Sequence, residues 1–203
     1  MNVAVVDYDA GNTLSVTRAL EKVGAKVDLT PDPERVVNAD AVVLPGVGAF
    51  GDCVRKLEER GMDVACRDVF EAGTPFLGVC VGLQVLFEGS EESPGVEGLG
   101  ILPGIVRRFR AGDLKVPHMG WNELDVRRAH PVLEGADGEA FYFVHSYHPE
   151  PGSENDLLAT SDYGTPFCAA AGRENLAAVQ FHPEKSSRAG LHLYENFLAW
   201  ARA

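Results

Sequence analysis

The sequence lacks any hydrophobic run long enough to cross a bilayer. Such a helix needs roughly 20 apolar residues, and the longest apolar stretches are short, strand-like pieces such as residues 41–44. The N-terminus has no basic segment before its apolar residues and soon reaches Asp7, which predicts a first strand and not a secretory leader. We therefore expect a cytoplasmic protein with no membrane partner.

The sequence also has few positive charges. Its 18 Lys and Arg stand against 30 Asp and Glu, which gives a net charge of −12. A nucleic-acid partner is excluded, because phosphate binding needs clustered cations. The nearest basic cluster holds Arg107, Arg108 and Arg110. On so acidic a chain these arginines fit solvated edge residues or a protein interface better than a phosphate groove.

Cysteine is scarce, and its spacing excludes two further classes. The four cysteines are widely separated and form no CxxC pair: Cys53, Cys66, Cys80 and Cys168. In a cytosolic chain this pattern predicts free thiols and not a disulfide framework or a zinc site. No second histidine or cysteine lies at ligand spacing from His182, so we expect no metal and no cofactor.

What the sequence does contain is a regular alternation of strands and helices. At 203 residues, with 45% hydrophobic and 24% charged residues, it predicts one well-cored α/β domain over residues 1–203. Strands are expected at 2–7, 25–29, 40–44 and 74–79, and helices at 13–23, 50–72 with a break at Gly61, and 81–88. Asn12 or Thr13 is the expected cap of the first helix. This order implies a mostly parallel central sheet with helices on both faces.

The second half is richer in shorter strands. These are expected at 105–109, 122–126, 140–144, 157–160, 167–171 and 176–181, and a last helix at 188–202. We expect the strands to form an antiparallel extension of the same sheet.

Gly78-Val79-Cys80-Val81-Gly82 has the pattern of a nucleophile elbow between a strand and a helix. The nucleophile of such a turn has a strained backbone, and side chains at the flanking positions would collide with the turn. The turn places the sulfur at the carboxyl end of the sheet, where α/β folds bind ligands, and the following helix would favour the thiolate. A small buried Cys80 beside two packing glycines is the alternative that these five residues leave open.

A second pattern, His182-Pro183-Glu184, follows the expected strand at 176–181. Residues two apart in an extended chain point to the same side, and Pro183 keeps His182 extended. Glu184 can then orient the imidazole, as in the base-and-orienter half of a nucleophile triad. In isolation, His182 also fits a capped surface residue at a strand end.

A third pattern is the glycine-rich stretch PGVGAF, residues 45–50, after another parallel strand. The backbone N–H of Val47 or Gly48, paired with that of Val81, could form an oxyanion hole. A phosphate cradle is the competing interpretation, but the stretch has neither a GK[ST] ending nor full GxGxxG spacing.

These three patterns, in this order, resemble the class I glutamine amidotransferase family over nearly the whole chain. Within this family, the chain resembles the branch of glutaminase subunits of imidazole glycerol phosphate synthase. Five segments carry this resemblance: PGVGAF, DYDAGNTLSV, PHMGWNEL, FYFVHSYH and HPEKS. The resemblance implies a single flavodoxin-like domain with Cys80 as nucleophile, His182 as base and Glu184 as its orienter. Glutamine would be cleaved through a γ-glutamyl thioester, and the ammonia would serve histidine biosynthesis.

The resemblance also implies binding residues and a partner. Gln84, Glu92, Ser146 and Tyr147 match positions that hold glutamine, although Glu92 lies in an acidic loop that reads equally as a solvated charge run. The partner would be a cyclase of (β/α)8 barrel fold, joined as a heterodimer, that receives ammonia through an internal channel. Residues matching its interface are Asn12, Trp121, Tyr142 and Lys185. Trp121 and Tyr142 fit core aromatics equally well.

In that branch the oxyanion loop is thought to be turned the wrong way until the partner binds, and Gly46 and Gly48 make such a peptide flip cheap. Three rivals remain: a glutaminase that feeds a different synthase, a cysteine hydrolase, peptidase or stress protein of similar fold, and a degenerate regulatory module. PGVG and HPEKS disfavour a glutaminase that feeds a different synthase. Gln84 and the His182–Glu184 pair disfavour a cysteine hydrolase, peptidase or stress protein. A degenerate regulatory module would lack a triad residue, and none is missing.

Overall fold

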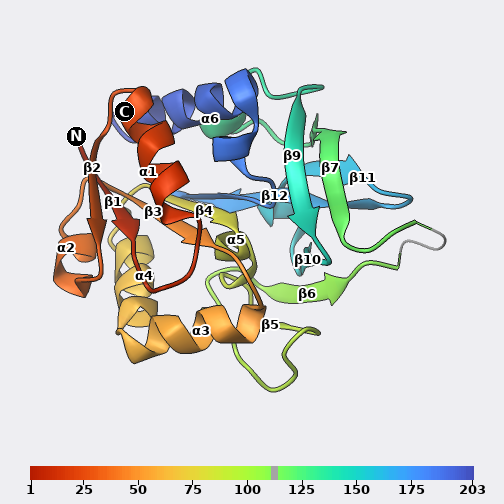
Figure 1. Ribbon diagram of the computed structural model, residues 1–203, viewed down its shortest axis with the longest axis horizontal. Helices are drawn as coiled ribbons and strands as arrows, with labels where there is room; N and C mark the ends of the chain where they lie inside the picture. The colour runs from red at the N-terminus through yellow and green to blue at the C-terminus, as the bar shows by residue number, and fades with distance from the viewer. Residues whose placement is uncertain (111–113) are drawn as a thin grey trace.

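An eight-stranded sheet runs through the computed structural model, which describes residues 1–110 and 114–203 (Figure 1). Its strand order is β2-β1-β3-β4-β13-β12-β11-β8, parallel as far as β13 and antiparallel beyond it. The strands are β1 (Asn2–Val6), β2 (Lys26–Thr30), β3 (Ala41–Gly46), β4 (Phe76–Cys80), β8 (Asp125–Val126), β11 (Leu157–Asp162), β12 (Pro166–Arg173) and β13 (Leu176–Val179). The expected mostly parallel α/β sheet is confirmed.

Helices cover both faces of this sheet. Figure 1 shows α1 (Thr13–Lys22) and α6 (Ser187–Trp200) on one face and α3 (Phe50–Glu59) and α4 (Met62–Glu71) on the other. The remaining helical pieces are α2 (Pro33–Val37), α5 (Val81–Gln84) and the 3-10 turns η1 (Pro131–Leu133), η2 (Glu154–Asp156) and η3 (Pro183–Lys185). Gly61 separates α3 from α4 as expected, with a φ of 67°. In the described part of the chain, no helix is both long and apolar enough to span a membrane.

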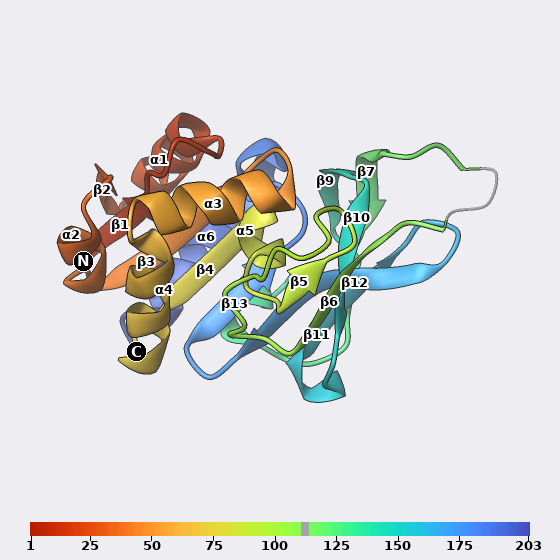
Figure 2. The same ribbon diagram turned by 90° about the horizontal axis from the view of Figure 1, so that it is seen from below.

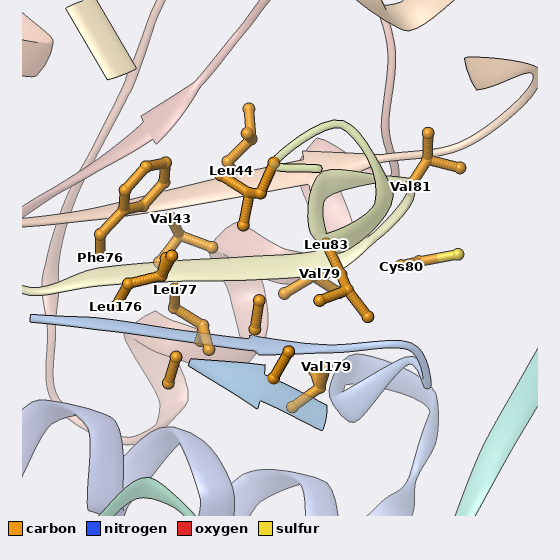
Figure 3. Packing of buried hydrophobic residues seen from close by; sticks show 14 of the residues in the cluster. Val43, Leu44, Phe76, Leu77, Val79, Cys80, Val81, Leu83, Leu176 and Val179 are labelled. Atoms are coloured by element: carbon orange, nitrogen blue, oxygen red, sulfur yellow. The ribbon is translucent and has the colours of Figure 1, made fainter. Parts of the chain in front are cut away.

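The central strands are buried because both of their faces are covered. Every residue of β3 and of β4 is buried, and these strands read as near-continuous apolar runs, as parallel strands do. Figure 3 shows their side chains packed against Leu176 and Val179 of β13. This rigid core holds the carboxyl ends of β3, β4 and β13 side by side.

One expectation about the second half is wrong. The strands expected at 105–109 and 140–144 do not extend the central sheet; they are β6 (Gly104–Arg108) and β9 (Ala140–His145), in two smaller sheets. β6 lies between β5 (Gly89–Ser90) and β10 (Tyr147–Pro151), and β9 pairs with β7 (His118–Glu123). The segment expected at 122–126 is divided between β7 and β8.

The β7–β9 ribbon packs one of its faces against the central sheet, because the side chains on one side of β9 are aromatic. Phe141 stacks on Phe181 with ring centroids 4.1 Å apart, and Phe143 meets Phe167 of β12 edge-on at 5.6 Å. Burying these rings requires contact through the face of the ribbon and not through its edge. Figure 2 shows the ribbon standing across the end of the central sheet.

The helix expected at 81–88 is also shorter than predicted, since α5 ends at Gln84. The next carbonyls bond to another segment: Val85 O accepts from Leu99 N at 2.7 Å, and Leu86 O accepts from Leu102 N at 3.0 Å. A longer helix would need these two carbonyl oxygens as acceptors for its own N–H groups. Because they accept from residues 99 and 102 instead, the helix does not continue. A single turn carries little of the aligned peptide dipole that the sequence argument assigned to it.

Candidate active site

The two sequence patterns around Cys80 and His182 meet at the carboxyl edge of the parallel sheet. Cys80 ends β4 beside Gly46 of β3, its register partner, and His182 follows β13, which pairs with β4 on the other side. A cavity of about 420 Å³ opens there. Its wall includes Cys80 and His182 together with Lys185.

Steric contacts explain the glycines around Cys80. Cys80 has a φ of +56°, a region that non-glycine residues rarely occupy. A Cβ on Gly82 would lie 2.0 Å from the carbonyl oxygen of Leu44, and one on Gly78 would lie 3.0 Å from the Cβ of Ala178. A side chain at position 82 would therefore clash with the backbone of β3, and one at position 78 would require its neighbours to shift.

The alternative of an inert, buried Cys80 fits the structure less well. The residue is only 4% exposed, but its sulfur lies at the edge of the core and points away from Val79, Leu83 and Val179 (Figure 3). It also lines the cavity. A thiol in this position is shielded from bulk solvent and still open to a bound ligand.

His182 and Glu184 form a buried pair. The Nδ1 atom of His182 lies 2.8 Å from Oε1 of Glu184, and the two side chains are 2% and 0% exposed. Burial is the largest influence on the His182 pKa and lowers it, but hydrogen bonds to Cys80 and Glu184, with their negative charges, raise the pKa to about 10. A protonated imidazole beside the sulfur is the partner that a thiolate nucleophile needs.

Glu184 stays ionised in spite of its burial. Burial is the largest influence on its pKa and raises it, but the hydrogen bond and charge of His182 and the donors around it lower the pKa below the ordinary value. Asn12 is one of these donors: its Nδ2 atom donates to Oε1 of Glu184 at 3.1 Å.

This contact corrects the expectation for Asn12. Asn12 occupies the N-cap position of α1, but its side chain makes no capping hydrogen bond and reaches across to Glu184 instead. No sequence motif predicts this pairing, because the two residues are 172 positions apart and share no local pattern.

The predicted oxyanion-hole residues, Val47, Gly48 and Val81, all line the cavity. β3 extends to Gly46, so the loop begins at Val47 and not at Pro45 as expected. The carbonyl oxygen of Val47 accepts a hydrogen bond from the Cys53 thiol at 3.4 Å, and Gly48 has a φ of +97°. The Cys53 thiol thus contacts the Val47–Gly48 peptide in its present orientation.

The four positions matched to glutamine binding, Gln84, Glu92, Ser146 and Tyr147, line the same cavity. Glu92 is not merely a solvated charge, because its Oε2 atom accepts from the backbone N–H of Phe50, at the start of α3, at 2.7 Å. Gln84 donates from Nε2 to the carbonyl oxygen of Tyr147 and to Oε1 of Gln180, both at 3.0 Å. Sequence reasoning missed Gln180, whose only signal is its place two residues before His182.

Three of the positions matched to a partner interface gather at one surface. Trp121 is 54% exposed, so the core-aromatic alternative is wrong for it, and its ring meets that of Tyr142 edge-on at 6.1 Å. The Nζ atom of Lys185 lies 5.9 Å from the Tyr142 ring centroid. The main chain of Tyr142 accepts from His182 N and donates to Ser186 Oγ, both at 2.9 Å.

Two other expectations can be compared with the structure. All four cysteines are free thiols, as expected. Arg107 of the basic cluster bonds to Glu91 and Glu150 at the surface, as a solvated edge residue does. Over residues 1–110 and 114–203, no group of three or more His, Cys, Asp or Glu side chains could hold a metal ion.

Comparison with known proteins agrees with this geometry. The family model "Glutamine amidotransferase class-I" matches residues 4–200. The chain is 52% identical to "Imidazole glycerol phosphate synthase subunit HisH" of Chromobacterium violaceum, covering 98% of each chain. It is 49% identical to the subunit of the same name in Syntrophotalea carbinolica, covering 96% of this chain and 98% of that one.

Solved structures support the fold. A crystal structure of a glutamine amidotransferase superposes with a TM-score of 0.77 at 23% identity, covering 99% of each chain. PurLQS from Thermotoga maritima superposes with a TM-score of 0.74 at 18% identity, covering 98% of each chain. The family model, and relatives about 50% identical over nearly their full length, show that the chain belongs to the class-I glutamine amidotransferase family, in its HisH branch.

Proposed function

We propose that this glutamine amidotransferase hydrolyses glutamine to glutamate and ammonia through Cys80, His182 and Glu184. The ammonia passes to a cyclase subunit of (β/α)8 barrel fold, which makes imidazole glycerol phosphate and AICAR in histidine biosynthesis. The observation that carries the proposal is the meeting of the Cys80 sulfur and the Glu184-braced His182 imidazole at one cavity.

The first half of the reaction forms a thioester. The Cys80 thiolate attacks the side-chain amide carbon of glutamine, and the negative charge moves to the amide oxygen. Backbone N–H groups of Val81 and of Val47 or Gly48 stabilise that oxygen, and one such donor contributes about 3 kcal/mol in known enzymes. The His182 imidazolium then protonates the leaving nitrogen, so that ammonia departs and the γ-glutamyl thioester remains.

The second half regenerates the thiol group. His182, now neutral, removes a proton from water, which attacks the thioester carbon. The carbon–sulfur bond breaks, glutamate leaves and the thiolate is restored beside the protonated imidazole. Glu184 stays ionised throughout and holds Nδ1, so that the other ring nitrogen faces the sulfur.

Four side chains of the cavity wall fit a bound glutamine. The carboxylate of Glu92 offers a partner for the α-ammonium group, and Gln84, Ser146 and Tyr147 offer polar groups along the same wall. The cavity, about 420 Å³, is large enough for one amino acid.

The partner surface is proposed to include Trp121, Tyr142 and Lys185, together with Asn12, which contacts Glu184. We expect low glutaminase activity from the isolated chain, as the resemblance to the HisH branch implies, since Gly46 and Gly48 on either side of Val47 make a flip of its peptide cheap. Engagement of the cyclase and its nucleotide ligand would turn the loop and complete the oxyanion hole. Equal turnover with and without the cyclase would contradict this part of the proposal.

The test is ammonia release from glutamine by the reconstituted complex of this chain and the cyclase. Cys80→Ala should abolish release, and a diazo-ketone analogue of glutamine should label wild type at Cys80 and leave the variant unlabelled. Cys168→Ala is the matched control, since this free thiol lies on β12 outside the cavity. Normal ammonia release by Cys80→Ala would overturn the assignment, and release with some other synthase alone would redirect the partner.

A further inference from the structure

Gln180 is a buried polar residue that the proposed mechanism does not use. It is 0% exposed and lies between β13 and His182. Its backbone N–H donates to the carbonyl oxygen of Ala169 at 2.8 Å, which attaches this position to β12. A fully buried amide side chain is costly unless its polar atoms are satisfied, so its contacts show what it does.

The contacts of Gln180 run from the substrate-binding wall to the nucleophile. Its Oε1 atom accepts from Nε2 of Gln84 at 3.0 Å. Its Nε2 atom lies 3.9 Å from the sulfur of Cys80, within reach of a hydrogen bond to sulfur. The Gln180 amide therefore stands behind the sulfur and joins it to Gln84.

The direction of this chain of hydrogen bonds is fixed at its far end. The carbonyl oxygen of Tyr147 can only accept, so the Gln84 atom that meets it at 3.0 Å must be the amino nitrogen. The same nitrogen donates to Gln180, whose atom on that side must then be its oxygen. The amino group of Gln180 is thereby turned toward Cys80, and the flipped orientation is excluded.

We propose that Gln180 is a positioning residue that aims an N–H donor at the Cys80 sulfur. This rests on the proposed function only in taking Cys80 as the nucleophile. A donor at the sulfur favours the charged thiolate over the neutral thiol. Because α5 is a single turn, the side chains around the sulfur supply this stabilisation and not a helix dipole.

A second consequence concerns the substrate wall. With both of its N–H groups used by Tyr147 and Gln180, Gln84 is left with its oxygen to offer to a ligand. The same chain of bonds that orients Gln180 thus presents an acceptor to the cavity. Loss of Gln180 would release Gln84 to rotate, which should weaken glutamine binding as well as alter the nucleophile.

The experiment measures the rate of Cys80 alkylation by iodoacetamide as a function of pH in the full chain. Cys80→Ala identifies which part of the labelling belongs to this thiol. Gln180→Met keeps the length of the side chain and removes the donor. We expect Cys80 of Gln180→Met to be alkylated about tenfold more slowly than that of wild type at the low-pH end of the profile, because a donor to the charged thiolate is lost. KM for glutamine in the cyclase complex should rise as well.

Asn175→Leu is the matched control for loss of a structural amide. Asn175 directly precedes β13, and its Nδ2 atom donates to the carbonyl oxygens of Phe70 and Thr74, at 3.1 and 2.7 Å. This variant should lower stability and leave the alkylation profile of Cys80 unchanged. A Gln180→Met profile that coincides with that of wild type would overturn the proposal, whereas absence of Cys80-dependent glutaminase activity in wild type would overturn the proposed function.

A measurement on wild type does not depend on the folding of a variant. The side-chain amide resonances of Gln180, followed by nuclear magnetic resonance, should shift as Cys80 titrates or when it is alkylated. The same resonances should not respond in Cys80→Ala. Identical amide shifts before and after alkylation would contradict a contact between the two side chains.

Discussion

At the scale of single residues, the site depends on charges kept in places that are almost closed to water. Glu184 is fully buried, yet its carboxylate is held ionised by the imidazole at 2.8 Å and the Asn12 amide at 3.1 Å. A hydrogen bond to a buried charge contributes about 1.5–3 kcal/mol, more than one between neutral groups. The positions of Asn12 and His182 are therefore tied to the charge of one carboxylate.

Asn12→Ala tests this dependence. Removing the amide leaves Glu184 with one fewer donor and lets it rotate, which should lower kcat about tenfold with little change in KM for glutamine. The measurement is steady-state ammonia release at saturating cyclase, so that weaker assembly does not enter. A loss that disappears at saturating cyclase would show that Asn12 acts only through the interface.

The raised pKa of His182 predicts how stability depends on pH. Its unfolded pKa is near 6.5 and its folded pKa is about 10, so the stabilisation is fully present below about pH 6.5 and is lost as pH rises toward 10. Wild type should therefore lose more free energy of unfolding between pH 7 and 10 than His182→Gln does. Urea denaturation at several pH values measures the free energy of unfolding of both proteins. Equal losses of this free energy in wild type and His182→Gln would contradict the raised pKa of His182.

Local motifs predicted that Cys80 and the His182–Glu184 pair belong to one site, because a strained turn and an extended His-Pro-Glu segment each have steric signatures within five residues. Asn12 and Gln180 carry no such signature. Their roles arise only when α1 and β13 meet β4 and η3, and contacts between distant segments are invisible in the pattern of either segment. The triad could be predicted from sequence, but its supporting amides could not.

At the scale of elements, close backbone approach holds the elbow in place. The start of α5 lies directly over the end of β3, where a Cβ on Gly82 would meet the Leu44 carbonyl oxygen at 2.0 Å. A backbone atom cannot move aside as the end of a flexible side chain can. The position of the nucleophile is therefore set by contact between two elements as well as by its own turn.

Gly82→Ala should disrupt this contact. We expect a loss of about 3 kcal/mol in the free energy of unfolding, as overpacking against a rigid neighbour produces, together with slower alkylation of Cys80. Gly89→Ala is the control, because its Cβ would make only ordinary contacts of 3.6 Å or more. Chemical denaturation of both variants gives the comparison, and equal stabilities would show that the turn relaxes freely.

Elements with both faces buried were the easiest to predict, since β1, β3 and β4 read as apolar runs bounded by turn residues. β10 was missed because it contains Pro149 and Pro151, which local rules read as loop. It pairs with β6 at the edge of a small sheet, where a strand tolerates proline. The length of α5 could not be predicted, because acceptors used by residues 99 and 102 end it.

At the scale of the whole molecule, we propose that a partner binds over two exposed apolar side chains of the β7–β9 ribbon. Met119 and Trp121 of β7 are 62% and 54% exposed, on a ribbon that stands at one end of the central sheet (Figure 2). An exposed tryptophan next to a functional cavity is typical of an interface anchor. The acidic chain, at net charge −12, would also attract a cyclase surface of positive charge.

Trp121→Ala should weaken assembly with the cyclase by about 2 kcal/mol or more, roughly 30-fold in Kd, as loss of a central aromatic anchor does. Val64→Ala is the control, since Val64 is 56% exposed on α4, far from the ribbon (Figure 1). Titration calorimetry with the purified cyclase gives both affinities. An unchanged Kd for Trp121→Ala would place the interface elsewhere.

The main chain of Tyr142 connects the β7–β9 ribbon to the backbone around His182. It is bonded to His182 on one side and to Ser186 on the other, while its ring lies between Trp121 and Lys185. Ser186 Oγ in turn donates to the carbonyl oxygen of His182 at 2.7 Å, so both main-chain bonds of Tyr142 lead to the His182 backbone, one directly and one through a hydroxyl. A subunit docked on the outer face of the ribbon would therefore bear on the backbone of the proposed proton carrier.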